Sequence, residues 1–316
     1  MSKHSLDPWT SLWQAGAGSS CYDGSKAELH LTRIWDEHVD TLPDEARMID
    51  LATGNGTVAL ICAARASAKK KQLKIDAVDS AGIDPAACLS DRKHLLSSIV
   101  FHDKTRLEAL PFRDGTFHSV VSQFGFEYAC EMRAAAEVAR VLIPSGHLCL
   151  VIHAKSGAVA RDIDLRLRRM HEVLAENGPV SLVLELIRAY EASDVSTIES
   201  KSQYLPAAMD LIKRFRQQPL GNDSALYYGY ESLRLWSDRN KFQPQGLRLS
   251  IEDAWTKIND MAIRQELMLS AVRDRQDLER LQQQFSKLGL VSGNLEKVRD
   301  ALGVQIAWRF DARKNA

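Results

Sequence analysis

Residues 48 to 154 alternate between apolar segments and segments with helical periodicity, and this alternation constrains the fold more than any other feature. The apolar segments are MIDLA at 48–52, LKIDAVD at 73–79, IVFHD at 99–103, HSVVSQFGFEY at 118–128, which runs into a loop, and GHLCLVIHA at 146–154. Helical segments are expected at 25–41, 57–68, 86–98 and 131–142, the last stopped by Pro144 and Gly146. Nearly continuous apolar strands between helices are typical of a parallel sheet covered on both faces. The sequence therefore predicts an α/β fold.

The alternation stops near residue 155. Residues 156–275 are mostly helical in pattern, with an aromatic cluster at 225–236 and a long helix from Ile251 that is expected to bend at 273–277. The segments KLGLVSG at 287–293 and VQIAWRFDA at 304–312 return to strand character. We therefore expect a core domain of residues 1–155 and 276–316, interrupted by a helical insertion of residues 156–275.

Charge and cysteine content narrow the class of protein. The 41 basic residues balance the 41 acidic ones, which argues against a nucleic-acid or anionic-membrane partner. No segment approaches the roughly 20 apolar residues of a membrane span, and the N-terminus lacks the pattern of a secretion signal. The five cysteines include no CxxC pair and the nine histidines no HxH or HxxxH pair. We expect a cytoplasmic protein without a metal.

A glycine turn joins the first apolar segment to the following helix, within MIDLATGNGTVAL at 48–60. Its spacing, Gly54-x-Gly56-x-x-Ala59, fits a dinucleotide-binding fingerprint. Asp50, however, precedes the turn, and one like charge at about 4 Å costs roughly 4 kcal/mol at a dielectric near 20. That carboxylate opposes a pyrophosphate, whereas it suits the positive sulfonium and ammonium groups of S-adenosylmethionine. Asp79, which follows the second strand, is placed to bind ribose hydroxyls whether the ligand is a dinucleotide or S-adenosylmethionine.

Two longer segments resemble one enzyme family. RLEALPFRDGTFHSVVSQFGFEY at 106–128 is similar to a segment of class I S-adenosylmethionine-dependent methyltransferases, in particular the small-molecule enzymes that include ubiquinone and menaquinone C-methyltransferases. EVARVLIPSGHLCLVIH at 137–153 resembles their next helix, turn and fifth strand. The resemblance covers about residues 22 to 153 and the last two strands. It implies S-adenosylmethionine as cofactor and a Rossmann-like sheet of seven strands, with residues 304–312 as the antiparallel last one.

The resemblance also implies a set of cofactor-binding residues. They are Asp50, Ala52, Thr53, Gly54, Asn55 and Gly56 for the methionyl part, Asp79 and Ser80 for the ribose, Leu107 and Glu108 for the adenine, Gln123 and Phe124 for the floor, and Tyr22 as a lid. Two positions depart from the family pattern. Ala52 replaces the first glycine, and Arg106 stands where an acid often binds the adenine. Glu108 can equally be a solvated acid, and Tyr22 can equally lie in a surface turn.

The chemistry and the acceptor are less defined. Methyl transfer needs mainly alignment, and a base only if the acceptor must lose a proton. The candidate catalytic residues beyond the fourth and fifth strands are His153, Glu127 and Tyr128; alternatively, His153 is hydrogen-bonded at a strand end and Glu127 is an ordinary acid. The aromatic residues of the insertion either line a pocket for a planar or apolar acceptor or form a helical core; they are Tyr204, Tyr227, Tyr228, Tyr230, Trp236 and Trp255. Trp9 and Trp13 are expected to dock on this insertion.

Three functions follow from these patterns. The first is a small-molecule methyltransferase whose insertion forms an acceptor lid, a homodimer interface, or both. The second is a catalytically silent protein that keeps the cofactor fold as a partner-binding scaffold, as the departures at Ala52 and Arg106 allow. The third is a nicotinamide-dependent oxidoreductase, for which an Asp50→Ala change would improve NAD binding.

Overall fold

The computed structural model describes residues 8–16, 26–85, 93–96 and 98–316. The chain divides into two compact units, one of residues 1–161 and 268–316 and one of residues 162–267. Tyr22 and most of the helix expected at 86–98 lie outside the described residues. Among the residues that are described, no helix has the length and apolar character needed to span a bilayer.

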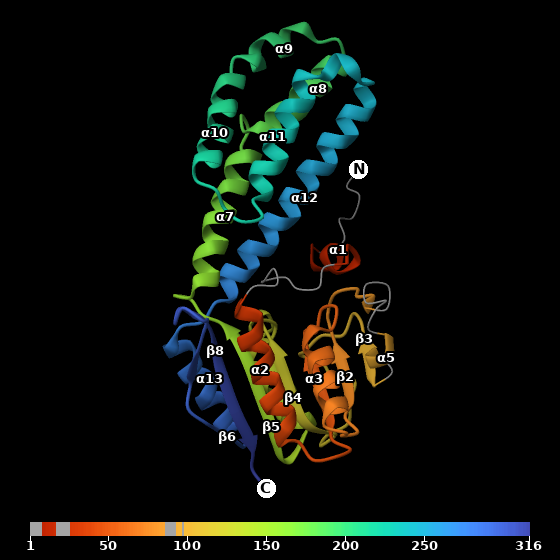
Figure 1. The fold of residues 1–316 in the computed structure, drawn as a ribbon, viewed down its shortest axis with the longest axis vertical. Coiled ribbons are helices and arrows are strands. Elements are labelled where there is room, and N and C mark those ends of the chain that lie inside the picture. The colour runs from red at the N-terminus through yellow and green to blue at the C-terminus, as the bar shows by residue number, and fades with distance from the viewer. Residues whose placement is uncertain (1–7, 17–25, 86–92, 97) are drawn as a thin grey trace. The chain divides into compact units, whose positions relative to one another are not determined.

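The first unit is built on one twisted sheet (Figure 1) with the order β3-β2-β1-β4-β5-β8-β6. Its first five strands are all parallel. Their bounds are β1 Arg47–Leu51, β2 Lys74–Val78, β3 Ile99–His102, β4 Phe117–Gln123 and β5 Leu142–His153. The predicted strands are therefore present, although β5 begins four residues before the expected start at Gly146. The strand order reverses between β1 and β4, which is where ligands bind in sheets of this kind.

The C-terminal end of the sheet differs from the predicted seven strands. β8, Gln305–Lys314, runs antiparallel to β5, as expected for the last strand. Its other edge is shared by β6, Leu290–Ser292, which pairs with the end of β8, and β7, Glu296–Arg299, which pairs with its beginning. β6 and β7 run in the same direction along this edge, so they occupy one strand position interrupted at residues 293–295. The described sheet thus has eight strands in seven positions.

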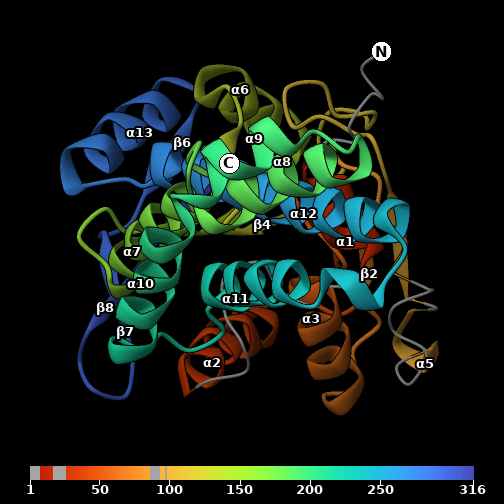
Figure 2. The same cartoon turned by 90° about the horizontal axis from the view of Figure 1, so that it is seen from above.

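Helices cover both faces of this sheet (Figure 2). α2, Lys26–Thr41, and α3, Thr57–Ala68, pack together on one face. α6, Glu131–Val141, and α13, Arg275–Lys287, pack together on the other, where Phe285 and Phe310 belong to the main hydrophobic cluster. A four-residue helix, α5 Lys93–Leu96, lies near β3, and the short α1, Pro8–Gln14, precedes the sheet in sequence. Alternating apolar strands and amphipathic helices therefore produce the expected three layers.

The second unit is helical. Its helices are α8 Pro179–Glu191, α9 Val195–Ser202, α10 Leu205–Gln217 and α11 Ser224–Ser237, together with most of α7 Ala158–Leu174 and α12 Pro244–Ala271. α12 begins seven residues before the predicted Ile251, because Pro244 is tolerated in a first helical turn. The expected bend at 273–277 is a break, and Asp274 begins α13 through a capping box with Asp277.

Most of the insertion's aromatic residues are not a helical core. Trp236 is buried, but Tyr227 is 61% exposed, and Tyr204, Tyr230 and Trp255 are exposed as well. The core of this unit is instead aliphatic, with Val180, Leu182, Val183, Leu186 and Ile187 of α8 fully buried. The sequence pattern indicated the helical character of this segment and its long last helix, but not which of the aromatic residues are buried.

Candidate functional site

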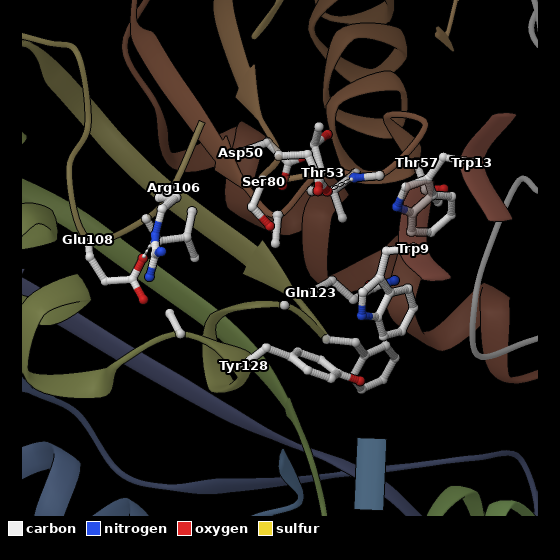
Figure 3. Close-up of a pocket in the computed structure, with 18 residues that line it drawn as sticks. Trp9, Trp13, Asp50, Thr53, Thr57, Ser80, Arg106, Glu108, Gln123 and Tyr128 are labelled. Atoms are coloured by element: carbon white, nitrogen blue, oxygen red, sulfur yellow. Dashed lines mark hydrogen bonds and ion pairs between the residues drawn. The ribbon is translucent and has the colours of Figure 1, made fainter. Parts of the chain in front are cut away.

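A cavity of about 410 Å³ lies at the carboxyl ends of β1, β2 and β4 in the first unit (Figure 3). Its volume falls in the range of small-molecule sites, roughly 300–1,000 Å³. The predicted residues that line it are Asp50, Ala52, Thr53, Gly54, Asp79, Ser80, Leu107, Glu108, Gln123, Phe124 and Tyr128. Arg106 lines it too. Positions far apart in the sequence thus meet at one edge of the sheet.

The glycine turn is a left-handed stretch of backbone. Ala52, Gly54 and Gly56 have φ angles of 52°, 54° and 89°. A Cβ added at Gly54 would lie 2.7 Å from the ring of Trp13, and one at Gly56 would lie 2.8 Å from Phe101. Gly56 and Asn55 support the turn from behind and are not among the lining residues. Both glycines are therefore required by backbone angle and by space.

Ala52 adopts the same strained angle without being glycine. Its Cβ lies close to the facing backbone, since a Cβ added at Gly125 would be 2.4 Å from it. Phe124, next to Gly125, also has a left-handed φ, of 56°. Left-handed backbone costs L-residues about 1–2 kcal/mol each. The pocket wall between β1 and β4 therefore holds two strained residues, which is a common property of ligand sites.

Asp50 is the most unusual charge in the pocket. It is 1% exposed, and its Oδ2 accepts hydrogen bonds from Thr53 Oγ1 at 2.6 Å and from the Ala59 amide at 3.2 Å. Burial raises the pKa of Asp50 to about 7, although both hydrogen bonds lower it; nearby Asp79 raises it further. Both donors are neutral, so the carboxylate is hydrogen-bonded without a countercharge from them. A cation in the pocket would stabilise its ionised form.

Asp79 joins the two loops of the pocket. Its Oδ2 accepts from the Gly54 amide at 2.8 Å and its Oδ1 from the Ala81 amide at 2.8 Å. The end of β2 is thereby tied to the glycine turn. A carboxylate oxygen has two acceptor sites, so these bonds are compatible with further hydroxyl donors.

Arg106 and Glu108 form a pair at the opposite side of the pocket (Figure 3). Arg106 Nε lies 3.3 Å from Glu108 Oε2, while Glu108 Oε1 accepts from the Cys130 amide at 2.9 Å. Burial would raise the pKa of Glu108, but the Cys130 and Arg106 bonds outweigh it and hold that pKa below its usual value. Glu108 is consequently a fixed acceptor rather than a solvated acid.

An aromatic wall completes the pocket, and sequence reasoning missed it. Trp9 stacks on Trp13 with centroids 6.2 Å apart and meets Tyr128 edge to face at 5.5 Å. Asn55 Nδ2 donates a hydrogen bond to the Trp13 carbonyl at 2.9 Å. A second bond holds α1 in place, since the Gly82 amide donates to Thr10 Oγ1 at 2.9 Å. The expectation that Trp9 and Trp13 dock on the insertion is therefore corrected: they pack over the glycine turn. Their spacing of four residues on a short helix was the available signal.

The structure places His153 and Glu127 behind the pocket wall. His153 is 1% exposed, and its Nδ1 and backbone amide lie 2.7 and 2.9 Å from the same Glu127 oxygen, Oε1. Phe124 stacks on the His153 ring at 4.2 Å, and Tyr128 meets it edge-on at 6.2 Å. Neither His153 nor Glu127 is a lining residue. Of the three catalytic candidates, Tyr128 alone reaches the cavity.

Within the described ranges, no cluster of three or more His, Cys, Asp or Glu side chains has the arrangement of a metal site. Cys62, on α3, and Cys149, on β5, are buried and not in a disulfide.

One comparison with known proteins matches part of the first unit. Residues 49–150 match the family model described as a methyltransferase domain. No sequence among the curated proteins matches this chain.

Solved structures with a similar fold include three of known source. A chain from the complex between the Haloferax volcanii Trm112 methyltransferase activator and a methyltransferase is 19% identical, over 48% of this chain and 62% of that one, with a TM-score of 0.34. Geranyl diphosphate C-methyltransferase from Streptomyces coelicolor A3(2) is 13% identical, over 40% of this chain and 46% of that one, with a TM-score of 0.34. Burkholderia thailandensis 1,6-didemethyltoxoflavin-N1-methyltransferase is 9% identical, over 97% of this chain and 85% of that one, with a TM-score of 0.46. This chain thus spans less than two thirds of the first two.

Proposed function

We propose that this chain, whose residues 49–150 form a class I methyltransferase domain, binds S-adenosylmethionine in the described pocket and methylates a small-molecule acceptor. The observation that carries the proposal is the buried carboxylate of Asp50, which lines the pocket. The hydrogen-bond donors to its Oδ2, Thr53 and the Ala59 amide, are both neutral. A cationic ligand supplies the missing positive charge. When bound, the cofactor provides a methyl group on a positively charged sulfur.

The remaining polar groups fit the same molecule. Asp79 follows β2 and can accept the ribose hydroxyls while it keeps its bonds to the turn. Glu108 is held as an acceptor for the adenine amino group. Leu107 lines the same cavity, and its backbone amide is proposed as a donor for the ring. Asp50 opposes a pyrophosphate, which supports S-adenosylmethionine over a dinucleotide.

The chain's own part in the reaction is mainly alignment. In-line displacement requires the acceptor atom and the methyl carbon to be held in register, and orientation can contribute roughly 7–11 kcal/mol. Tyr128 lines the cavity and is the candidate to hold or accept a proton from the acceptor. His153 and Glu127 support the floor under Phe124, so a direct role as base would require Phe124 or Tyr128 to move.

The helical unit is proposed to serve acceptor recognition, self-association, or both. Its exposed aromatic residues, among them Tyr227 and Trp255, support a role at a surface that is covered in the working protein. A planar or apolar acceptor would suit such side chains.

Isothermal titration calorimetry with S-adenosylhomocysteine and with NADH tests the assignment. We expect micromolar binding of S-adenosylhomocysteine and none of NADH. Absence of S-adenosylhomocysteine binding at high micromolar concentration would refute the methyltransferase function. Tighter binding of NADH, improved by Asp50→Ala, would instead identify an oxidoreductase.

A further inference from the structure

The side-chain amide of Gln123 has a fixed orientation. The indole nitrogen of Trp35, on α2, donates to Gln123 Oε1 at 2.8 Å. An indole N–H can only donate, so the amide oxygen must be the atom that faces Trp35. Trp35 is fully buried, which restricts its movement. Gln123 itself lines the pocket, and its amide nitrogen, a donor of two hydrogens, is the polar atom left to meet a ligand.

Two aromatic rings line the same cavity as this amide. In the view of Figure 3, Trp9, Tyr128 and Gln123 lie on one side of the cavity, and Arg106 and Glu108 lie on the other. Trp9 and Tyr128 meet at an interplanar angle of 79°, so their rings form a corner. A flat molecule can lie against one ring and present its edge to the face of the other, and both arrangements are favourable.

The charges of the pocket select against anions. Asp50, Asp79 and Glu108 line it, and Arg106, the basic residue among those described there, is already paired with Glu108. An anionic acceptor would therefore meet like charges without a countercharge of its own. A neutral acceptor avoids this cost.

We propose that Gln123, Trp9 and Tyr128 form the acceptor subsite, and that it takes a neutral planar ring system whose edge carries a carbonyl oxygen or another hydrogen-bond acceptor. The Gln123 amide donates to that atom, and Trp35 is the positioning residue that keeps the amide from turning over. The inference rests on the proposed function and reassigns the Gln123 side chain from the cofactor to the acceptor.

Three bicyclic probes of similar shape test this subsite by saturation-transfer NMR, with S-adenosylhomocysteine present at saturation. Chromone is a neutral ketone that only accepts, naphthalene has no polar atom, and indole only donates. We expect chromone to bind about tenfold more tightly than naphthalene or indole, since one neutral hydrogen bond is typically worth that ratio or slightly less.

Substitutions separate the hydrogen bond from packing. Gln123→Leu is expected to remove the preference for chromone, and Gln123→Glu to reverse it in favour of indole, because a carboxylate accepts where the amide donated. Trp35→Phe should reduce the preference severalfold by letting the amide turn. Trp308→Phe, a buried tryptophan of β8 that does not line the pocket, is the matched control and should leave all three affinities unchanged.

The S-adenosylhomocysteine affinity of each variant distinguishes this inference from the proposed function. Reversal of probe preference in Gln123→Glu supports the subsite. The subsite would be overturned if chromone and naphthalene bind equally well, or if chromone shows no saturable binding. It would also be overturned if the variants lose affinity for chromone only in proportion to their loss of affinity for S-adenosylhomocysteine. Failure of the wild-type protein to bind S-adenosylhomocysteine refutes the function itself.

Discussion

Two acids on the same sheet, Asp50 and the partly exposed Asp311, have opposite surroundings. Asp50, at the end of β1, accepts hydrogen bonds only from neutral groups in the contacts described above, and burial raises its pKa to about 7. Asp311, on β8, lies 3.2 Å from His147 Nε2 and 2.7 Å from Arg309 Nε. Burial would raise the pKa of Asp311 as well, but His147 and Arg309 outweigh it and lower that pKa to about 2.

The difference separates a structural charge from a binding charge. The positive partner of Asp311, Arg309, comes from the chain itself, so this carboxylate stabilises the fold. Asp50 is placed in the pocket without such a partner, so the chain carries an electrostatic cost until a cation arrives. Strongly raised acid pKa values in a cleft are typical of functional sites for this reason.

The largest expected effect is on cofactor affinity. Asp50→Asn keeps an oxygen for Thr53 and Ala59 but removes the charge, so we expect the affinity for S-adenosylmethionine to fall by up to about 1,000-fold, equivalent to roughly 4 kcal/mol. Calorimetric titration measures it. Asp76→Asn is the matched control, since Asp76 is a buried acid on β2 that pairs with Arg47 and His102 and does not line the pocket. An equal loss in both variants would contradict the comparison.

The same Asp50→Asn change should stabilise the fold. The folded-state pKa of about 7 exceeds the unfolded value of 3.8, so the ionised group costs stability that is regained as pH falls from 7 toward 4. We expect the free energy of unfolding of the variant to exceed that of the wild-type protein by about 2–4 kcal/mol at pH 8. At pH 5 the difference should be less than half as large. Urea denaturation at both pH values measures this. A destabilised variant at pH 8 would show that Asp50 is already satisfied.

Asp311→Asn should act in the opposite direction. The lowered pKa of Asp311 contributes stability that is fully present above pH 4 and is lost as pH falls toward 2. Allowing for its partial exposure, we expect a loss of about 1–2 kcal/mol at pH 7 and a smaller loss at pH 3. Cofactor affinity should stay unchanged. Stabilisation by this change would remove the contrast with Asp50.

The smallest effect concerns the strained turn. Ala52→Gly relieves a φ angle of 52°, worth about 1–2 kcal/mol, against an entropic cost of roughly 0.5–1 kcal/mol. A net gain of up to about 1 kcal/mol in unfolding free energy is expected. The control is Ala68→Gly at the end of α3, where no left-handed angle exists and glycine should destabilise. A loss at position 52 would mean that the Ala52 methyl packs favourably against Gly125.

Much of the fold could be predicted because its signals are local. Apolar strands, helical periodicity and the glycine turn each occupy a short stretch, and Asp50, Asp79 and Gln123 are placed by the strand ends that precede them. The broken edge strand was missed because β7, with the sequence EKVR, has only Val298 buried. An edge strand needs little apolar surface, so its pattern is weak.

The site was less predictable where it depends on distant contacts. Trp13 reaches the pocket through contacts with Gly54 and Asn55, and Trp9 through its contact with Tyr128, all of them distant in the sequence. His153 is the last residue of the fifth strand, but it pairs with Glu127 and does not line the cavity. Position at a strand end therefore predicts proximity to a site, whereas side-chain direction depends on the tertiary partners.

The most direct test of the central claim is a carbon-13 NMR titration of the Asp50 carboxyl group, free and with saturating sinefungin, an amine analogue of S-adenosylmethionine. We expect a pKa near 7 in the free protein, and a fall of about two when the cation binds. A pKa near 4 in the free protein, or one that sinefungin leaves unchanged, would contradict it.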